Sequence, residues 1–358
     1  MRVPRYGTAS LAEFMPSIAA ALGDPAFANT LGFPQAQHAV AVLVDGLGLA
    51  QLAAYAEDAP TLARALESPA IDAAFPTTTP VGLGSLGLGA VPGFHGMVGA
   101  TFRLPETGEV LRPLAWAEQP LPAMVQPEET FFERTALPVR YHGPRAYADS
   151  GLTRAVLRAA APRPYDRLDD VVLDPAGGID HVYIPELDKS GHFHGVGSRE
   201  WRADLRRIDT RIADYLERLP STSIVCVTSD HGMRNIDDAD RIDIDASTYR
   251  AGVDRLAGEP RMRHIYTGQP QAVAARWAAA LGDRAHILLR EDAIALGLFG
   301  AVEPGIDDRI GDIIAIARDG WALCAASFDA KVSALRGLHG GLTDDELLVP
   351  ALALHGVA

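Results

Sequence analysis

Three short apolar segments, each leading into an aspartate, restrict the fold of this 358-residue chain more than any other feature. They read HAVAVLVDGLG (38–48), HVYIPELDKSGH (181–192) and STSIVCVTSDHG (221–232). Continuous apolar character without alternation is typical of strands buried on both faces, as in a parallel sheet covered by helices. Ligands bind such open sheets at the carboxyl ends of the strands. We therefore expect each of the three strands to end at its aspartate, at one edge of a sheet.

The segment SREWRADLRRIDTRIADYLERL (198–219) has apolar residues at intervals of three and four, which predicts an amphipathic helix. Strands that alternate with such helices indicate a doubly wound, mostly parallel α/β sheet flanked by helices. We find no internal repeat, and expect residues 1–358 to form a single domain.

Two stretches, at about 97–145 and 233–310, interrupt this pattern and are expected to be excursions from the sheet. The first is rich in proline and irregular. The second contains the helix-like PQAVAARWAAAL and the strand-like AHILLR, after which the chain is expected to return through GDIIAIAR. Insertions of this kind commonly shape a substrate entrance, so both should form a cap and a pocket near the carboxyl ends of the strands.

Composition narrows the functional classes. The formal net charge of −14, without a basic tract, argues against binding of a nucleic acid polymer. No run approaches the roughly 18 apolar residues of a membrane span, and the N-terminal segment does not resemble a signal peptide. The two cysteines, Cys226 and Cys324, have no metal-ligand spacing. We expect a cytoplasmic protein without a disulfide scaffold or a thiolate zinc site.

Three carboxylates and three imidazoles stand at predicted strand ends or in tight glycine turns. They are Asp45 in VDG, Asp188 and His192 in DKSGH, Asp230 and His231 in SDHG, and His339 in GLHGG. Each alone has an ordinary explanation, since a single histidine is more often a core or surface residue than a ligand. A buried strand that ends in adjacent titratable groups, as at SDHG, needs something to satisfy them. Together the six can form two adjacent nitrogen and oxygen sites suited to zinc and, less specifically, to manganese.

The motifs VDGLG, FPTTTP…HG, ELDKSGHFHG, TSDHGM and GLHGG, in this order over about residues 38–345, resemble the type I phosphodiesterase and nucleotide pyrophosphatase family of the alkaline phosphatase superfamily. The resemblance implies an alkaline-phosphatase-like fold and two neighbouring zinc ions. One site would use Asp188, His192 and His339, and the other Asp45, Asp230 and His231. It also implies a threonine nucleophile and hydrolysis through a phospho-threonine intermediate.

In the family pattern a Pro-Thr pair is followed one residue later by the nucleophilic threonine, then after six residues by serine, and later by glycine and His-Gly. The corresponding residues here are Pro76 and Thr77, Thr79, Ser85, Gly89, and His95 with Gly96. Thr79 is therefore the expected nucleophile, whereas Thr77 and Thr78 are expected to hydrogen-bond nearby backbone.

The chain departs from the pattern at Gly82, where the family often has an asparagine that donates to the phosphoryl oxygen. Stabilisation of the transition state would then fall to backbone N–H groups or to another side chain. His194, next to the ligand motif, is expected to support a ligand rather than to bind metal.

The expected substrate is a small-molecule phosphate ester or anhydride, with a phosphodiester or a nucleotide pyrophosphate favoured. A phosphomonoesterase or a phosphonate hydrolase would share nearly all of these ligands and stays open. A non-catalytic metal- or phosphate-binding protein with the same fold is the alternative from another class. The oligomeric state is open as well.

Overall fold

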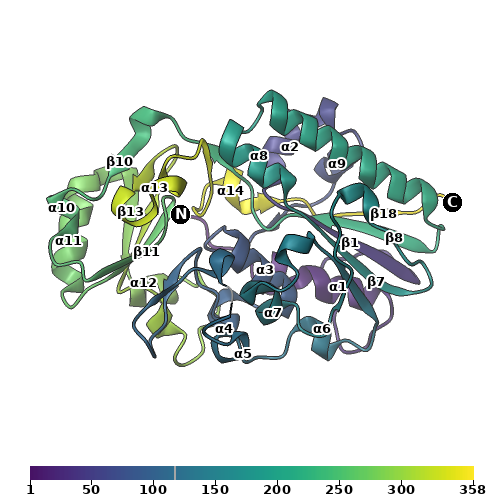
Figure 1. Cartoon of the computed structure of the whole chain (residues 1–358), viewed down its shortest axis with the longest axis horizontal. Helices are drawn as coiled ribbons and strands as arrows, with labels where there is room; N and C mark the ends of the chain where they lie inside the picture. Colours follow the sequence, from purple (N-terminus) through teal and green to yellow (C-terminus); the bar gives the residue numbers. More distant parts are fainter. Residues whose placement is uncertain (117) are drawn as a thin grey trace.

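The computed structural model describes residues 1–116 and 118–358, and its main sheet has six strands in the order β18–β8–β1–β7–β5–β6 (Figure 1). In chain order they are β1 (His38–Val44), β5 (Val139–His142), β6 (Ala161–Pro162), β7 (Gly178–Ile184), β8 (Ser223–Thr228) and β18 (Leu352–His355). All are parallel to their neighbours except β18, which pairs antiparallel with β8 at one edge. The predicted mostly parallel α/β sheet is confirmed.

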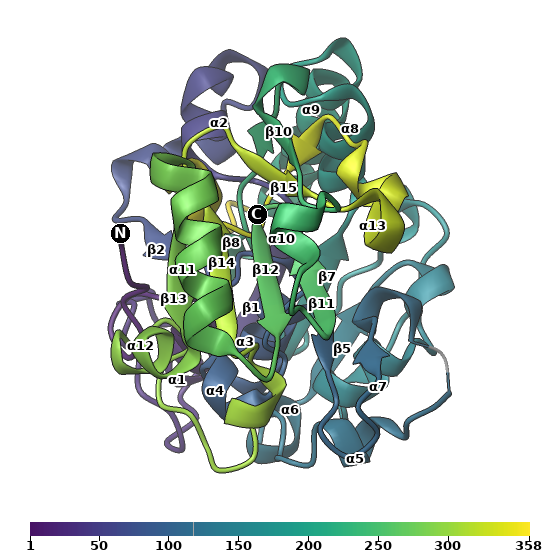
Figure 2. The ribbon, with the colours of Figure 1, turned by 90° about the vertical axis from the view of Figure 1, so that its left-hand side faces the viewer.

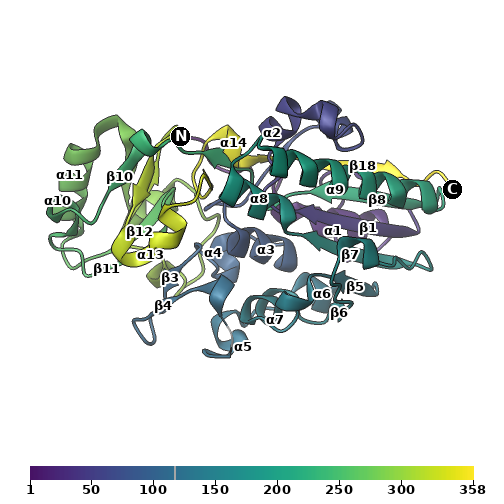
Figure 3. The same ribbon diagram turned by 45° about the horizontal axis from the view of Figure 1, so that its top comes forward.

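Helices cover both faces of this sheet (Figures 1 and 3). One face carries α1 (Phe14–Ala21), α3 (Thr79–Leu88), α6 (Phe131–Arg134) and α7 (Gly151–Val156), and the other carries α2 (Leu49–Ala54) and α9 (Arg199–Arg218). In β1, Ala39, Ala41 and Leu43 pack into the first layer, whereas Val40, Val42 and Val44 pack into the second. Because both faces are buried, the strand sequence shows no alternation.

Helix α9 matches the amphipathic helix that the sequence predicts. The Ser198 hydroxyl caps it by accepting a hydrogen bond from the Trp201 N–H at 3.1 Å. Its buried face, with Trp201, Leu205 and Ile208 among its members, packs against the second layer of the sheet.

Strand β7 ends at Ile184, so the expectation that Asp188 ends a strand is wrong. Asp188 and His192 lie on the helix that follows, α8 (Glu186–His194), which begins just after Pro185. A spacing of four residues puts both side chains on one face of that helix. The Asp188 side chain still lies at the edge of the sheet where β7 ends, but it is positioned there by the first turn of α8.

A second sheet, antiparallel and in the order β11–β12–β14–β13, lies beside the first and is covered by α11 (Figure 2). Its elements are β11 (Arg255–Glu259), β12 (Met262–Tyr266), α11 (Pro270–Leu281), β13 (Ala285–Leu289) and β14 (Ile313–Ala317). The helix and the strand expected within residues 233–310 are confirmed. The expected return through residues 311–318 is wrong, because β14 pairs with β12 and β13 and the chain re-enters the main sheet only at β18.

Shorter elements complete the chain. The helices are α4 (Pro92–His95), α5 (Pro122–Val125), α10 (Ser247–Arg250), α12 (Arg290–Ala295), α13 (Ala326–Ser333) and α14 (Asp344–Leu347). The paired strands are β2 (Ile71–Asp72) with β17 (Leu348–Val349), β3 (Phe102–Arg103) with β4 (Val110–Leu111), β9 (Arg234–Asn235) with β16 (Gly337–Leu338), and β10 (Arg241–Asp243) with β15 (Ala322–Cys324). Among the described residues, no helix combines the length and the apolar character needed to span a bilayer.

Candidate metal centre and active site

Six side chains from four segments of the chain converge at the carboxyl edge of the main sheet. Asp45 directly follows β1, and Asp230 and His231 follow β8, which is the parallel neighbour of β1. On the other side of β1, β7 leads into α8 with its two ligand residues. His339 directly follows β16, whose pairing with β9 brings it close to the turn after β8.

The first group consists of Asp188, His192 and His339. The Nε2 atoms of the two histidines are 3.2 Å apart, and the Asp188 carboxylate lies 3.3 Å from His192 Nε2 and 3.7 Å from His339 Nε2. One nitrogen or oxygen atom from each residue therefore faces a common point, and these atoms all lie within 4.8 Å of one another. This geometry can hold one metal ion.

The second group consists of Asp45, Asp230 and His231, all of them buried. His231 Nε2 lies 3.4 Å from Asp45 Oδ1 and 3.6 Å from Asp230 Oδ2. The two groups are adjacent, because the rings of His231 and His339 stack with centroids 3.7 Å apart and planes 15° from parallel. The six residues predicted as ligands therefore lie together, in the same two sets of three.

All three imidazoles are held in the same way, through Nδ1 and a backbone carbonyl. Nδ1 of His231 lies 2.9 Å from the Gly232 oxygen, that of His192 2.7 Å from the Gly337 oxygen, and that of His339 2.9 Å from the Thr77 oxygen. A carbonyl can only accept, so Nδ1 carries the proton and donates it. Nε2 of each ring is then left with its lone pair directed into the centre, the form that binds a metal ion.

The carboxylates of the centre lack the partners that buried charges require. Asp45 Oδ1, Asp188 Oδ1 and Asp230 Oδ2 are buried and have no hydrogen-bond partner within residues 1–116 and 118–358. Among the described residues, no lysine or arginine forms an ion pair with any of the three. Burial, followed by the negative charges of Asp230 and Asp188, raises the pKa of Asp45 well above its ordinary value, and burial likewise raises the pKa of Asp230. A bound divalent cation at each group would satisfy these oxygens, so the residues fit the predicted metal pair.

The three consecutive threonines that precede α3 make three different contacts. The Thr77 hydroxyl donates to the Gly341 carbonyl at 2.8 Å and accepts from the Gly340 N–H at 3.1 Å, which ties it to the His339 turn. Thr78 is the N-cap residue of α3, and its side chain lies beside the Glu259 carboxyl. Thr79 is the first residue of α3, and its Oγ1 lies 3.3 Å from His231 Nε2.

Gly82, in the first turn of α3, packs directly against the second ligand group. A Cβ atom at this position would lie 2.5 Å from Asp230 Cβ and 3.1 Å from Asp230 Cα. No side chain fits there without displacing Asp230, so glycine is required by close approach. In the first turn of α3 the N–H groups of Val81 and Gly82 donate to the Thr78 carbonyl, and Pro80 has no N–H. The N–H of Thr79 itself has no acceptor among the described residues and is free to bind an anion.

Two residues of the centre escaped the sequence analysis. The Tyr183 hydroxyl, from β7, donates to Asp45 Oδ2. The buried Glu259, at the end of β11 in the second sheet, places Oε2 3.7 Å from His339 Nδ1, and burial raises its pKa well above the ordinary value. The sequence did not predict them because Tyr183 stands within an apolar strand, where it resembles a core residue, and Glu259 stands in an excursion that contains no motif. His194, by contrast, is exposed at the end of α8 and hydrogen-bonds no described side chain, so its expected support is not seen.

A cavity of about 360 Å³ opens onto Thr79 and both ligand groups. Its lining consists of Asp45, Thr79, Leu83, Pro113, Leu114, Tyr141, Tyr147, Ser150, Leu152, Thr153, Tyr183, Pro185, Asp188, Lys189, His192, Phe193 and Leu335. The expected excursion at 97–145 supplies Pro113, Leu114 and Tyr141, although Tyr141 lies on β5, so the end of this stretch belongs to the main sheet and not to an excursion. Four more lining residues follow within 147–153. No described residue of 233–310 lines it, so the expectation that both excursions build the pocket is wrong for the second.

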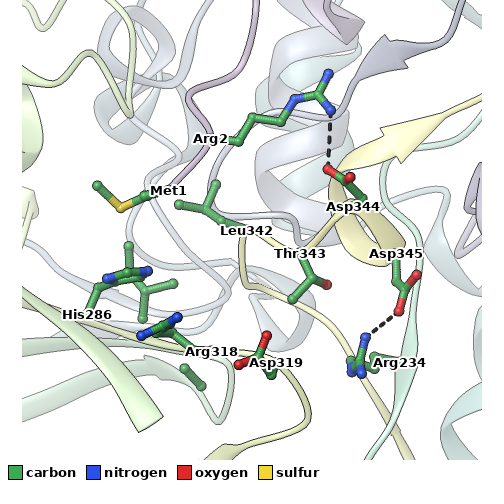
Figure 4. A pocket seen from close by; sticks show the side chains of 12 residues that line it. Met1, Arg2, Arg234, His286, Arg318, Asp319, Leu342, Thr343, Asp344 and Asp345 are labelled. Atoms are coloured by element: carbon green, nitrogen blue, oxygen red, sulfur yellow. Dashed lines mark hydrogen bonds and ion pairs between the residues drawn. The ribbon is translucent and has the colours of Figure 1, made fainter. Parts of the chain in front are cut away.

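A larger cavity, of about 430 Å³, lies elsewhere, between the N-terminal residues, the second sheet and the loop before α14 (Figure 4). Ion pairs of Arg2 with Asp344 and of Arg234 with Asp345 cross its wall. It is lined by neither Thr79 nor any of the six ligand residues. Because it lacks convergent groups of this kind, the smaller cavity is the candidate active site.

The fold resembles solved structures along nearly its whole length. Murine ectonucleotide pyrophosphatase/phosphodiesterase 5 superposes with a TM-score of 0.68 at 18% identity, covering 90% of this chain and 89% of that one. The human counterpart gives 0.67 at 17% identity, with 88% and 87% covered. Phosphonoacetate hydrolase from Sinorhizobium meliloti 1021, solved with phosphonoformate, gives 0.65 at 20% identity, with 90% and 91% covered. The fold is therefore alkaline-phosphatase-like.

No curated protein sequence matches this chain. A family model does, that of the type I phosphodiesterases and nucleotide pyrophosphatases, over residues 39–342. This span contains Thr79 and all six residues of the two ligand groups. The chain thus belongs to the type I phosphodiesterase/nucleotide pyrophosphatase family and is a hydrolase of that type.

Proposed function

We propose that this enzyme hydrolyses a phosphodiester or pyrophosphate bond of a small molecule, with Thr79 as nucleophile and two zinc ions as cofactors. The observation that carries the proposal is the position of Thr79. Its hydroxyl lies 3.3 Å from His231 Nε2, on the cavity wall and at the first position of a helix. A hydroxyl at this point is within reach of an ion held by the second ligand group.

Asp188, His192 and His339 would hold one ion, and Asp45, Asp230 and His231 the other. Bound zinc supplies Lewis acidity, which lowers the pKa of a coordinated hydroxyl and stabilises negative charge on phosphoryl and leaving-group oxygens. Manganese or another divalent metal would serve the same ligand set. The Nδ1 anchors keep the three rings in the neutral form that such an ion requires.

In the first half-reaction, Thr79 Oγ1 would attack phosphorus, forming an oxygen–phosphorus bond while the bond to the leaving oxygen breaks. The proton of the Thr79 hydroxyl passes to solvent, and the leaving oxygen takes up a proton from solvent, so that the leaving group departs as an alcohol or a phosphate. In the second half-reaction, water attacks the phosphorylated Thr79, the bond between Oγ1 and phosphorus breaks, and the hydroxyl is regenerated. The positive end of α3, next to Thr79, favours the negative charge of the phosphoryl group.

Two ligand complexes of similar proteins support a phosphorus substrate of small size. An inactive threonine-to-alanine variant of murine ectonucleotide pyrophosphatase/phosphodiesterase 5 binds AMP. The bacterial phosphonoacetate hydrolase binds phosphonoformate. The second complex favours phosphonate hydrolysis as the alternative activity for this chain. A cytoplasmic location stays a prediction.

The test combines metal analysis with hydrolysis assays of wild type and Thr79→Ala. About two zinc ions per chain are expected in both proteins, with cleavage of bis(p-nitrophenyl) phosphate only by wild type. Ser85→Ala removes another buried hydroxyl of α3, one that is bonded to His95 of α4, and is the control for a general effect on α3. Turnover by Thr79→Ala at the wild-type rate would refute the nucleophile, and a protein that binds no metal would refute the metal pair.

A further inference from the structure

Lys189 is an unusual residue in this chain and in this cavity. The sequence has only two lysines, Lys189 and Lys331, among 32 basic residues. Lys189 is exposed, and its ammonium group forms no ion pair or hydrogen bond with any described residue. It is also the one lysine or arginine among the described residues that line the candidate active site.

Helix α8 explains how Lys189 reaches the cavity. Asp188 and His192 are four residues apart and share the face that carries metal ligands. Lys189 and Phe193 are also four residues apart, so they share the neighbouring face, one residue further around the helix. Both line the cavity, and the Phe193 side chain is 60% exposed. The first face of α8 thus serves the metal centre, and the second faces the space beyond it.

The rest of the cavity wall offers little to an anion. Its other charged members are the carboxylates of Asp45 and Asp188, and most of the remainder is apolar or aromatic, including Leu114 and Tyr147. In a protein with a net charge of −14, an anionic group placed beyond the metal centre would therefore find one compensating charge, Lys189. An exposed ammonium group without a partner among the described residues is ready to bind it, since no existing ion pair has to break.

We propose that Lys189 is a specificity residue that binds a second oxyanion of the substrate, attached next to the reacting phosphorus. The proposal rests on the proposed function, because it needs the reacting phosphorus at Thr79. Two chemical sources would supply such an oxyanion: a second phosphoryl group, as in a nucleotide pyrophosphate, or a carboxylate, as in a phosphonocarboxylate. A diester with two neutral substituents offers none and makes no use of Lys189.

The test compares substrates with and without the second oxyanion, using the zinc-loaded protein. Bis(p-nitrophenyl) phosphate lacks it, ATP carries it as a phosphoryl group, and phosphonoacetate carries it as a carboxylate. Lys189→Gln is expected to lower kcat/KM about tenfold on an oxyanion-bearing substrate, mainly through KM, as for the loss of one charge-assisted hydrogen bond. Cleavage of bis(p-nitrophenyl) phosphate should stay within about twofold. Lys189→Arg should restore most of the loss, and Lys331→Gln, on the exposed part of α13, should change neither.

The substrate on which the loss is seen, ATP or phosphonoacetate, identifies the oxyanion. An equal loss on all substrates would overturn the proposal, because it would mean that Lys189 acts on the metal ligands beside it. No loss on any substrate would overturn it as well. If wild type cleaves none of the three substrates, the proposed function is refuted. The role of Lys189 is then tested by calorimetric measurement of pyrophosphate and orthophosphate binding. Lys189→Gln should then weaken binding of pyrophosphate about tenfold and binding of orthophosphate less than twofold, whereas equal effects would refute the oxyanion site.

Discussion

Replacing Asp180 with asparagine is expected to destabilise the fold by about 3 to 5 kcal/mol while leaving the folded enzyme active. Asp180 lies near the start of β7 and is fully buried. Its Oδ1 accepts from His142 Nε2 at 2.7 Å and from Arg140 Nε at 2.8 Å. Its Oδ2 accepts from His38 Nε2 at 2.9 Å, from the Asp174 N–H at 3.0 Å and from Arg140 Nη2 at 3.1 Å.

The magnitude follows from the number of donors that asparagine cannot satisfy. A histidine can change tautomer to accept from the new amide, but a guanidinium group or a backbone N–H cannot. With the amide nitrogen at the Oδ1 position, Arg140 Nε loses its acceptor. With the nitrogen at the Oδ2 position, Arg140 Nη2 and the Asp174 N–H lose theirs. Either orientation also removes the buried negative charge opposite Arg140, and breaking a buried ion pair in this way costs about 3 to 5 kcal/mol.

Urea unfolding at pH 7, followed by tryptophan fluorescence, measures this difference. Asp166→Asn is the matched control, because Asp166 pairs with Arg145 on the surface and its loss should leave the unfolding curve close to that of wild type. Activity per folded molecule should persist in Asp180→Asn, since Asp180 lies at the opposite end of β7 from α8. A midpoint as near to wild type as that of the control would refute the reasoning.

The same network predicts how the difference depends on pH. Burial alone would raise the pKa of Asp180, but hydrogen bonds from His142, His38 and Arg140 outweigh it and hold the pKa far below its ordinary value. A carboxylate with a depressed pKa stabilises the fold fully above the pKa of the unfolded chain, about 3.9, and loses this effect as the pH falls further. The stabilisation that comes from the ionised Asp180 carboxylate should therefore be fully present above about pH 5, and the gap between wild type and variant should shrink below about pH 4.

Two further predictions concern the metal centre. Chelation with EDTA should lower the melting temperature by several degrees, and added zinc should restore it, because bound zinc gives the unpartnered oxygens of Asp45, Asp188 and Asp230 a partner. Each site filled at 100 times its Kd adds about 2.7 kcal/mol to the free energy of unfolding. Identical melting curves with and without chelator would contradict the metal pair. Gly82→Ala should lower both zinc content, measured by elemental analysis, and diester hydrolysis at least tenfold, because the new methyl group displaces Asp230. Gly268→Ala is the control and should change neither quantity, since its new methyl group has nothing within 4 Å.

The parts of the molecule that sequence could predict depend on local pattern. The apolar runs predict β1 and β8 because both faces of these strands are covered, and the adjacent turn residues Asp45, Asp230 and His231 follow directly from the strand ends. Asp188 was predicted at the end of a strand but lies on the helix that follows it, because a run of apolar residues does not show that the strand ends before Pro185 and that a helix begins there.

The remaining features depend on contacts between distant segments. Glu259 reaches the metal centre from a separate sheet, and Thr77 braces the turn after His339 from the other end of the chain. Neither residue stands in a pattern that distinguishes it from an ordinary buried acid or a turn threonine. The same holds for the cavity wall, because which side chains of an irregular excursion face inward is decided by its packing.

The backbone anchors of the three imidazoles have an evolutionary consequence. Because His192, His231 and His339 are each oriented by a carbonyl oxygen, none of the three rings depends on a hydrogen bond from a side chain of the cavity wall. Mutations in the cavity wall can then alter the shape and charge of the substrate space without turning the ligands away from the centre. A lineage with this arrangement is free to exchange one phosphorus substrate for another while its metal chemistry stays intact.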